Sequence, residues 1–363
     1  MKIIFIFTKS ITFNTFLVSQ ANYFVKKGFN VEVGCCDIEN LNFKKQLSHR
    51  IDFPNKISDF FGILRYFKIF LQINAIIKKN PEAIFYLHTP LASFFFRLFT
   101  FFYNLKIIYF VHGFRFNVST NFFKSLFFKS IEKILSYNTK IFITINDEDY
   151  KYTKFNLLKK SLCYKINGVG LDLPEKHFKK KITKKNKIKK ILVVAVYKKD
   201  KGYFDLLKLA EILKNDKIKI ECYGYGSYDK FNSIRIKKKL RNISFKKFDK
   251  NLKSKIKNYD ILLHLSKREG LPVAVMESLS EGLPVICYNI RGNNDLIINN
   301  YNGIFIKSYR EVPYKINYFN LEENFFNKMR FNAFKSINRK FLKKKINSDV
   351  YNIIRGNFSK KSR

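Results

Sequence analysis

Acidic residues are scarce in this chain of 363 residues: 28 Asp and Glu stand against 70 Lys and Arg, so the formal net charge is +42. Three explanations stay open. The excess can come from a compositional bias toward Lys, from attraction to anionic lipid at about 1 kcal/mol per basic residue near the surface, or from nucleic-acid binding. The usual nucleic-acid-binding motifs are missing, so nucleic acid is not expected as a partner, and an anionic membrane surface is.

Cysteine and histidine are sparse as well, with five residues of each. The cysteines show no CxxC spacing and their number is odd, which is typical of reduced core residues in a cytoplasmic protein. The histidines are scattered, without HExxH or similar ligand spacing. Neither a metal site nor another cofactor is therefore expected.

Long apolar runs are also missing. No small-residue cleavage site follows the run Ile3–Phe7, which we expect to be a buried strand and not a signal peptide. The aromatic stretch Ala92–Tyr103 contains Arg97 and falls short of the roughly 20 apolar residues of a spanning helix. Any membrane contact is therefore expected to be peripheral, on the inner face of the cytoplasmic membrane.

Apolar residues make up 46% of the chain and aromatic residues 17%, which excludes wholesale disorder. Short runs that are apolar on both faces alternate with helical stretches throughout, a pattern typical of parallel sheets covered on both sides. The expected strands are Lys2–Phe7, Val31–Cys35, Ala83–Leu87, Ile107–Val111 and Lys140–Ile145, then Ile191–Val196, Ile218–Tyr223, Tyr259–Leu265, Pro284–Tyr288 and Gly303–Ile306. The predicted fold class is α/β, with two doubly wound Rossmann-like domains that face each other across a cleft.

The chain length and a lysine-dense stretch give the domain boundaries. We expect an N-terminal domain at 1–175, a Lys-rich linker at 176–190 and a C-terminal domain at 191–340. The strongly basic segment 341–363 is either a helix packed back on the domains or a solvated tail.

The most informative segment is Glu269-Gly270-Leu271-Pro272, which follows an expected buried strand, and Glu277 lies beyond it. Pro272 suits the first turn of a helix, and the free N–H groups and positive dipole end at Gly270 and Leu271 suit a diphosphate. Glu277 would then lie two turns, or roughly 12 Å, beyond Glu269. In the alternative interpretation, Glu269 is a first-turn acid favoured by the helix dipole and Glu277 a surface residue.

This segment resembles the E-x7-E element of family 4 glycosyltransferases. Other motifs in matching order look like the branch that builds exopolysaccharide, capsule and O-antigen: His88-Thr89-Pro90, Tyr109–Phe114, Ile143–Tyr150, Gly168–Asp172 and Arg291–Ile297. The resemblance covers nearly the whole chain and implies the GT-B fold. It also implies metal-independent transfer of a sugar from a nucleotide diphosphate sugar.

The resemblance implies that Glu269 contacts the hydroxyls of the donor sugar and that Glu277 contacts the ribose. It also implies that His112 lies beside the reacting sugar. His112 closes an expected strand at the edge where α/β sites form; the alternative is a core histidine, and for His88 the two interpretations are evenly matched. We therefore predict that His112 and Glu269 are catalytic.

The remaining predicted site residues are expected to bind the donor. The resemblance implies that Lys201 neutralises the departing diphosphate, a role that can replace a metal. Val196 stands where the family commonly has an arginine, and Lys198 is expected to substitute for it. Gly224 opens a Gly-x-Gly turn that looks like the one near the nucleotide base, and Gly270, Leu271 and Pro272 complete the set together with Glu277.

The resemblance thus implies a retaining glycosyltransferase that moves a hexose or N-acetylhexosamine, with UDP the expected nucleotide. The expected acceptor is a polyprenyl diphosphate-linked saccharide in cell-surface polysaccharide biosynthesis. Two alternatives stay open: an epimerase or hydrolase of nucleotide sugars on the same scaffold, and a non-catalytic basic protein that binds membrane or nucleic acid.

Overall fold

The computed structural model describes residues 1–43, 48–54, 63–117, 120–157, 160–174, 177, 183–184 and 187–358. Its internal contacts divide the chain into two compact units, which are residues 1–170 together with the C-terminal helix, and residues 171–342. These limits lie close to the expected boundaries at 175 and 340. Most of the expected linker 176–190 lies outside the described residues.

The first unit contains a seven-stranded sheet in the order β3-β2-β1-β4-β5-β6-β7, and all its pairs are parallel. Its central strands are apolar on both faces because helices connect consecutive strands, and β1 and β4 carry side chains that are fully buried on alternate faces. The strands are β1 (Lys2–Ile6), β2 (Asn30–Cys35), β3 (Ser48–Arg50), β4 (Ile84–Leu87), β5 (Lys106–Val111), β6 (Ile141–Thr144) and β7 (Leu162–Lys165).

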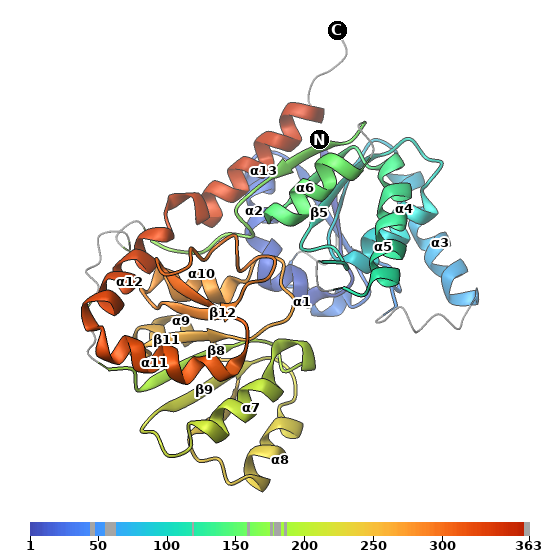
Figure 1. The fold of residues 1–363 in the computed structure, drawn as a ribbon. Coiled ribbons are helices and arrows are strands. Elements are labelled where there is room, and N and C mark those ends of the chain that lie inside the picture. Colours follow the sequence, from blue (N-terminus) through green and yellow to red (C-terminus); the bar gives the residue numbers. More distant parts are fainter. Residues whose placement is uncertain are drawn as a thin grey trace. The chain divides into compact units, whose positions relative to one another are not determined.

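Helices follow most of these strands (Figure 1). They are α1 (Ser10–Thr12) with a π-helical turn (Phe13–Leu17), α2 (Val18–Lys26), α3 (Ile63–Lys79), α4 (Pro90–Phe99), α5 (Phe122–Leu135) and α6 (Asp147–Asn156). One apolar cluster joins β1, β4 and β5 to the inner faces of α3 and α4, with Ile69, Ile73, Phe95 and Phe96 at its centre. That packing holds the ends of β4 and β5 in fixed positions.

The basic C-terminal segment forms helix α13 (Lys343–Phe358), which belongs to the first unit and lies beside α2 (Figure 1). Tyr351 packs its ring against Phe24 and Phe29, and the Asn347 amide donates to Ser19 Oγ. The helix buries Ile346, Val350 and Ile354, so its apolar stripe faces the unit while its lysines stay in water.

The second unit contains a six-stranded parallel sheet in the order β10-β9-β8-β11-β12-β13. The strands are β8 (Lys190–Val194), β9 (Lys219–Gly224), β10 (Ile243–Lys247), β11 (Ile261–His264), β12 (Val285–Tyr288) and β13 (Gly303–Ile306). The helices are α7 (Tyr203–Ile212), α8 (Asp229–Lys237), α9 (Leu252–Lys255), α10 (Val273–Ser280), α11 (Val312–Leu321) and α12 (Glu323–Ser336). Since β9, β8 and β11 are neighbours, the loops that follow them meet at one edge of the sheet.

The predicted α/β class with two doubly wound sheets is confirmed, and each expected strand is present within two residues of its predicted ends. Three strands were missed: β3, β7 and β10. All three lie at sheet edges, where one side of the strand faces solvent and the apolar signal is weak.

Candidate functional site

Two loops of the second unit are fastened together at the carboxyl edge of its sheet. The loop after β8 contains a 3₁₀ turn (Lys199–Lys201) that ends at Gly202, and the loop after β11 contains Leu265 and Lys267. The Lys267 N–H donates to the Asp200 carbonyl over 2.9 Å. Gly202 has φ +80°, and a Cβ there would lie 2.2 Å from the Leu265 carbonyl oxygen. Only glycine allows this approach, and it sets the position of the adjacent Lys201.

Lys201 and Glu269 form an ion pair between these two loops. Lys201 Nζ lies 2.6 Å from Glu269 Oε1 and also donates to the Arg268 carbonyl over 3.1 Å. His264, the last residue of β11, places Nε2 3.3 Å from the same carboxylate oxygen, without an aligned hydrogen bond. The Lys201 and Glu269 side chains are only 18% and 15% exposed, so the pair is largely withdrawn from water.

The charge on Glu269 is stabilised by these two neighbours. Burial raises the pKa of the carboxyl group, but the His264 imidazole and the Lys201 ammonium outweigh burial and lower the pKa to about 2. Glu269 is therefore a carboxylate at neutral pH, able to accept hydrogen bonds from hydroxyl groups but not to donate a proton.

The backbone around Glu269 is clamped from a third loop, which follows β12. Arg291 is buried and its Nε donates to the Glu269 carbonyl over 3.0 Å. Gly292 has φ +81°, and a Cβ there would lie 2.3 Å from the Gly270 carbonyl oxygen. The motifs that begin at Glu269 and at Arg291 thus touch, and the contact fixes the course of Gly270 and Leu271.

Helix α10 begins at Val273, and two expectations for this helix are wrong. Pro272 is the N-cap residue with φ −74° and ψ 116°, not a first-turn residue, and its side chain caps nothing. Glu269 lies in the loop ahead of the helix, so the two-turn spacing to Glu277 does not apply. Only the part from Val273 to Glu277 is helical, a rise of about 6 Å. The structure also rules out the first-turn interpretation of Glu269.

The N-terminus of α10 lies four residues after Glu269 in the chain. The helix has no side-chain cap, so its first N–H groups and the positive end of its dipole are available to an anion. The two loops and the helix end together offer a cation, a carboxylate and backbone N–H donors at one edge of the sheet.

Gly224 ends β9 next to the loop after β8. A Cβ at this position would lie 1.9 Å from the Ala195 carbonyl oxygen, so glycine is required for the approach. The next residue, Tyr225, stacks on Phe248 with ring centroids 4.0 Å apart and planes at 15°. Both rings are partly exposed.

Lys198 has an exposed side chain, and the structure brings Lys201, not Lys198, to Glu269.

His112 belongs to the first unit, where it follows β5 directly. Its Nε2 lies 3.1 Å from Nδ1 of His88, which follows the neighbouring strand β4. Burial lowers the pKa of His112 to about 4 and that of His88 well below the ordinary value. Both rings are therefore neutral at pH 7. Gly113 takes φ +135°, a conformation that favours glycine.

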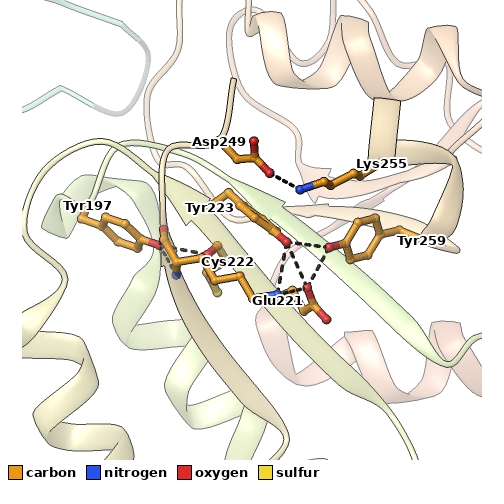
Figure 2. A network of polar contacts seen from close by, with 8 residues as sticks. Tyr197, Glu221, Cys222, Tyr223, Asp249, Lys255 and Tyr259 are labelled. Atoms are coloured by element: carbon orange, nitrogen blue, oxygen red, sulfur yellow. Dashed lines mark hydrogen bonds and ion pairs between the residues drawn. The ribbon is translucent and has the colours of Figure 1, made fainter. Parts of the chain in front are cut away.

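A second polar network, which was not predicted, lies on the opposite face of β9 from the buried Cys222 (Figure 2). Glu221 accepts hydrogen bonds from Lys246 and from the Tyr259 hydroxyl. The Tyr223 hydroxyl is hydrogen-bonded to the same two residues. Although burial raises the pKa of Glu221, these donors lower it below the ordinary value. Each polar group has a partner, so the network ties β9 and β10 to the residues that precede β11.

His264 is the site residue that the sequence interpretation missed, and Arg291 was included in a motif without a role. Their positions in the sequence could have identified them, because His264 ends β11 and Arg291 lies in the loop after β12, both at the carboxyl edge of a parallel sheet. Among the residues that the structure describes, no group of three or more His, Cys, Asp or Glu residues could hold a metal ion.

The two parallel α/β sheets define the GT-B class of fold. The family model "Glycosyl transferases group 1" matches residues 174–336, and "Glycosyl transferase 4-like" matches residues 2–146. The chain therefore belongs to the family 4 (group 1) glycosyltransferases, as its motifs predicted, and it is a glycosyltransferase enzyme.

Two curated relatives share most of their length with the chain. The putative glycosyltransferase EpsD of Bacillus subtilis is 24% identical over 324 residues, which are 84% of this chain and 83% of EpsD. The UDP-Gal:alpha-D-GlcNAc-diphosphoundecaprenol alpha-1,3-galactosyltransferase of Escherichia coli is 23% identical over 265 residues, 68% of each chain.

Among solved structures, Anabaena Alr3699/HepE in complex with UDP and glucose superimposes with a TM-score of 0.75. It is 14% identical and covers 98% of this chain, with 100% of its own chain matched. At this identity the similarity is evidence for the fold alone, and it supports the GT-B fold.

Proposed function

We propose that the chain is a retaining glycosyltransferase that uses a UDP-sugar and a lipid-linked saccharide acceptor. The observation that carries the proposal is the ion pair between Lys201 and the ionised Glu269, beside the uncapped N-terminus of α10. A cation and free helix N–H groups stabilise a diphosphate, while a carboxylate accepts hydrogen bonds from sugar hydroxyls. A nucleotide diphosphate sugar offers both groups on one molecule.

In the proposed reaction, the bond between the sugar and the diphosphate breaks, and negative charge grows on the departing oxygen. An acceptor hydroxyl oxygen bonds to the sugar carbon, and its proton passes to the departing phosphate oxygen. Lys201 and the first N–H groups of α10 would stabilise that charge. Glu269 would hold the sugar hydroxyls, and its pKa of about 2 keeps it in the accepting form at all physiological pH values. His112 would contact the reacting sugar and Glu277 the ribose. No metal is required for these roles.

The aromatic pair Tyr225 and Phe248 supports a nucleotide site at the same sheet edge. The stacked rings follow Gly224 and the end of β10, and both keep exposed surface. A flat exposed ring offers a surface on which a base can stack. The Gly-x-Gly turn that begins at Gly224 would then lie beside the base.

The proposed substrates take their support from two proteins similar to this chain. The name of the E. coli relative specifies UDP-Gal as donor and a GlcNAc unit on diphosphoundecaprenol as acceptor. The Anabaena structure holds UDP and glucose. We therefore propose that the donor is a UDP-hexose or UDP-N-acetylhexosamine and that the acceptor is linked to a polyprenyl diphosphate. The proposed pathway is cell-surface polysaccharide biosynthesis.

We further propose that the first unit binds the anionic inner face of the cytoplasmic membrane, where such an acceptor is anchored. No helix among the described residues is long and apolar enough to cross a bilayer. In the first unit, the aromatic helix α4 buries Phe95 and Phe96 in the core. On α5, by contrast, Phe122, Phe123 and Phe127 are 72%, 77% and 60% exposed. Exposed rings among lysines favour contact with lipid headgroups.

In the decisive experiment, the purified full-length chain is incubated with undecaprenyl diphosphate-linked GlcNAc and, in turn, with UDP-hexose and UDP-N-acetylhexosamine donors. The expected result is a lipid-linked disaccharide with retained configuration, and UDP release that depends on acceptor. UDP release without acceptor would instead indicate a hydrolase, and failure to bind any UDP-sugar would favour a non-catalytic protein. Lys201→Met should lose the activity. Lys238→Met, which breaks an exposed ion pair of the same unit, should keep it.

A further inference from the structure

His88 and His112 face each other at the carboxyl edge of the first sheet. The two residues directly follow the paired strands β4 and β5, and His88 Nδ1 lies 3.1 Å from His112 Nε2. A separation of this size between two ring nitrogens is a hydrogen bond, with one proton between them. The orientation of the His112 ring therefore depends on His88.

His88 itself is held rigidly. Its side chain is fully buried, stacked on Phe5 at 5.7 Å and 10°, and flanked by Tyr86 and Phe110 at 4.3 and 5.3 Å. The packed rings leave it a single orientation.

The backbone around His88 is fixed as well. The His88 N–H donates to the Ile6 carbonyl over 2.7 Å. The next residue, Thr89, has φ +63°, a conformation that costs a non-glycine residue on the order of 1–3 kcal/mol. Two hydrogen bonds between Thr8 and Thr89 Oγ1, at 3.1 and 2.7 Å, hold it there. A strained turn kept in place by its neighbours is common at functional sites.

The surroundings of His88 decide which nitrogen carries the shared proton. His88 Nε2 is buried and has no hydrogen-bond partner among the described residues. Protonated at Nε2, His88 would bury an N–H without an acceptor, and orphaned buried N–H groups are rare. With the proton on Nδ1 instead, His88 donates to His112 Nε2. Since His112 is neutral, its own proton must then reside on Nδ1.

We propose that His88 is a positioning residue, which fixes both the ring orientation of His112 and its Nδ1–H tautomer. The inference rests on the proposed function in one respect: the Nδ1–H of His112 is the donor that would meet a sugar oxygen. A histidine side chain in water prefers the other tautomer, with the proton on Nε2. The Nδ1–H form of His112 therefore needs His88.

The test compares His88→Asn with His88→Leu. The two replacements are nearly equal in size, but only the Asn amide can place a donor where His88 Nδ1 stands. The full-length protein, labelled with ¹⁵N histidine, is observed by NMR, which reads the tautomer of each of the five histidines. Native His112 should carry its proton on Nδ1, His88→Asn should keep it there, and His88→Leu, which removes the donor to Nε2, should raise the share of the Nε2–H form.

Activity gives the second readout. Loss of one hydrogen bond to a reacting ring should lower kcat by about 10-fold in His88→Leu, with less change in KM, and His88→Asn should stay within about 3-fold of native. A packing role predicts that both variants behave alike, or that the apolar Leu does better among the aromatic rings.

Several outcomes would overturn the assignment. Native His112 protonated on Nε2 would reverse the proposed direction of donation, and this result needs no variant. Equal tautomers or equal kcat in the two variants would leave His88 a packing residue. A native protein without transferase activity would overturn the proposed function, while the NMR comparison would still decide how the two rings share their proton.

Discussion

Replacing Glu269 with Gln removes one charge from the second unit and nearly nothing from its volume. The structure places this carboxylate 2.6 Å from Lys201 Nζ and 3.3 Å from His264 Nε2. The Gln amide keeps the shape but leaves the lysine cation, which is 18% exposed, without its partner. Both stability and turnover should therefore fall.

The shift in pKa gives the size of the stability effect. The pKa of Glu269 is about 2 in the folded protein against an ordinary value of 4.5, and each unit corresponds to about 1.4 kcal/mol. The charged form thus stabilises the fold by about 3–4 kcal/mol, and solvent screening reduces this little because the carboxylate is largely buried. We expect Glu269→Gln to lower the free energy of unfolding by about 2–3 kcal/mol in urea, followed by circular dichroism. Turnover should fall roughly 100-fold, about 2.7 kcal/mol in the barrier.

Glu211→Gln is the matched control. Glu211 pairs with Lys238 in the same unit over the same 2.6 Å, but the two side chains are 47% and 42% exposed. Exposed pairs of this kind contribute about 0–1 kcal/mol, and Glu211 lies outside the proposed site. The control should therefore unfold and turn over nearly as the native protein does. Equal losses in the two variants would refute the burial argument, and near-normal turnover in Glu269→Gln would remove Glu269 from the site.

The stabilisation by Glu269 should also depend on pH in one direction. Because folding lowers the pKa of this carboxyl group, its contribution is present above about pH 4.5 and is lost as pH falls toward 2. The difference in unfolding free energy between native protein and Glu269→Gln should be constant from pH 7 to about pH 5 and shrink to less than half near pH 3. A difference that grows on acidification would contradict the assigned ionisation.

Two further predictions concern metal and membrane. Activity should survive a chelator, because Lys201 supplies the counter-charge to the diphosphate, whereas Lys201→Ala should abolish most of it; a requirement for manganese or magnesium would contradict this role. Purified protein should sediment with anionic liposomes, and less of it should sediment as the salt concentration rises. Replacing Phe122, Phe123 and Phe127 with Ser should weaken this binding. The control Tyr314→Ser, which removes an exposed ring of the second unit, should not. Absence of binding at low salt would leave the charge excess a matter of composition.

The strand pattern could be predicted because each buried strand of a parallel sheet is apolar along nearly its whole length, as in β1, β4 and β11. The motif from Glu269 to Pro272 could also be recognised from the sequence, because Gly and Pro mark the boundaries of a strand–loop–helix junction. The start of α10 was placed one residue too early. Pro272 is compatible with both the N-cap and the first turn, and only the backbone angles distinguish them.

The sequence by itself determined the fold class and the family and predicted the residues of a donor site, because strand periodicity and motif spacing are local properties of the chain. Tertiary structure alone decided which of these residues meet. His264 and Lys201 are 63 residues apart in the chain but share Glu269 Oε1, and the close approach at Gly202 that brings them there requires the folded sheet. The pKa of Glu269 and the pairing of His88 with His112 depend on burial and on distances between strands, which exist only after the chain has folded.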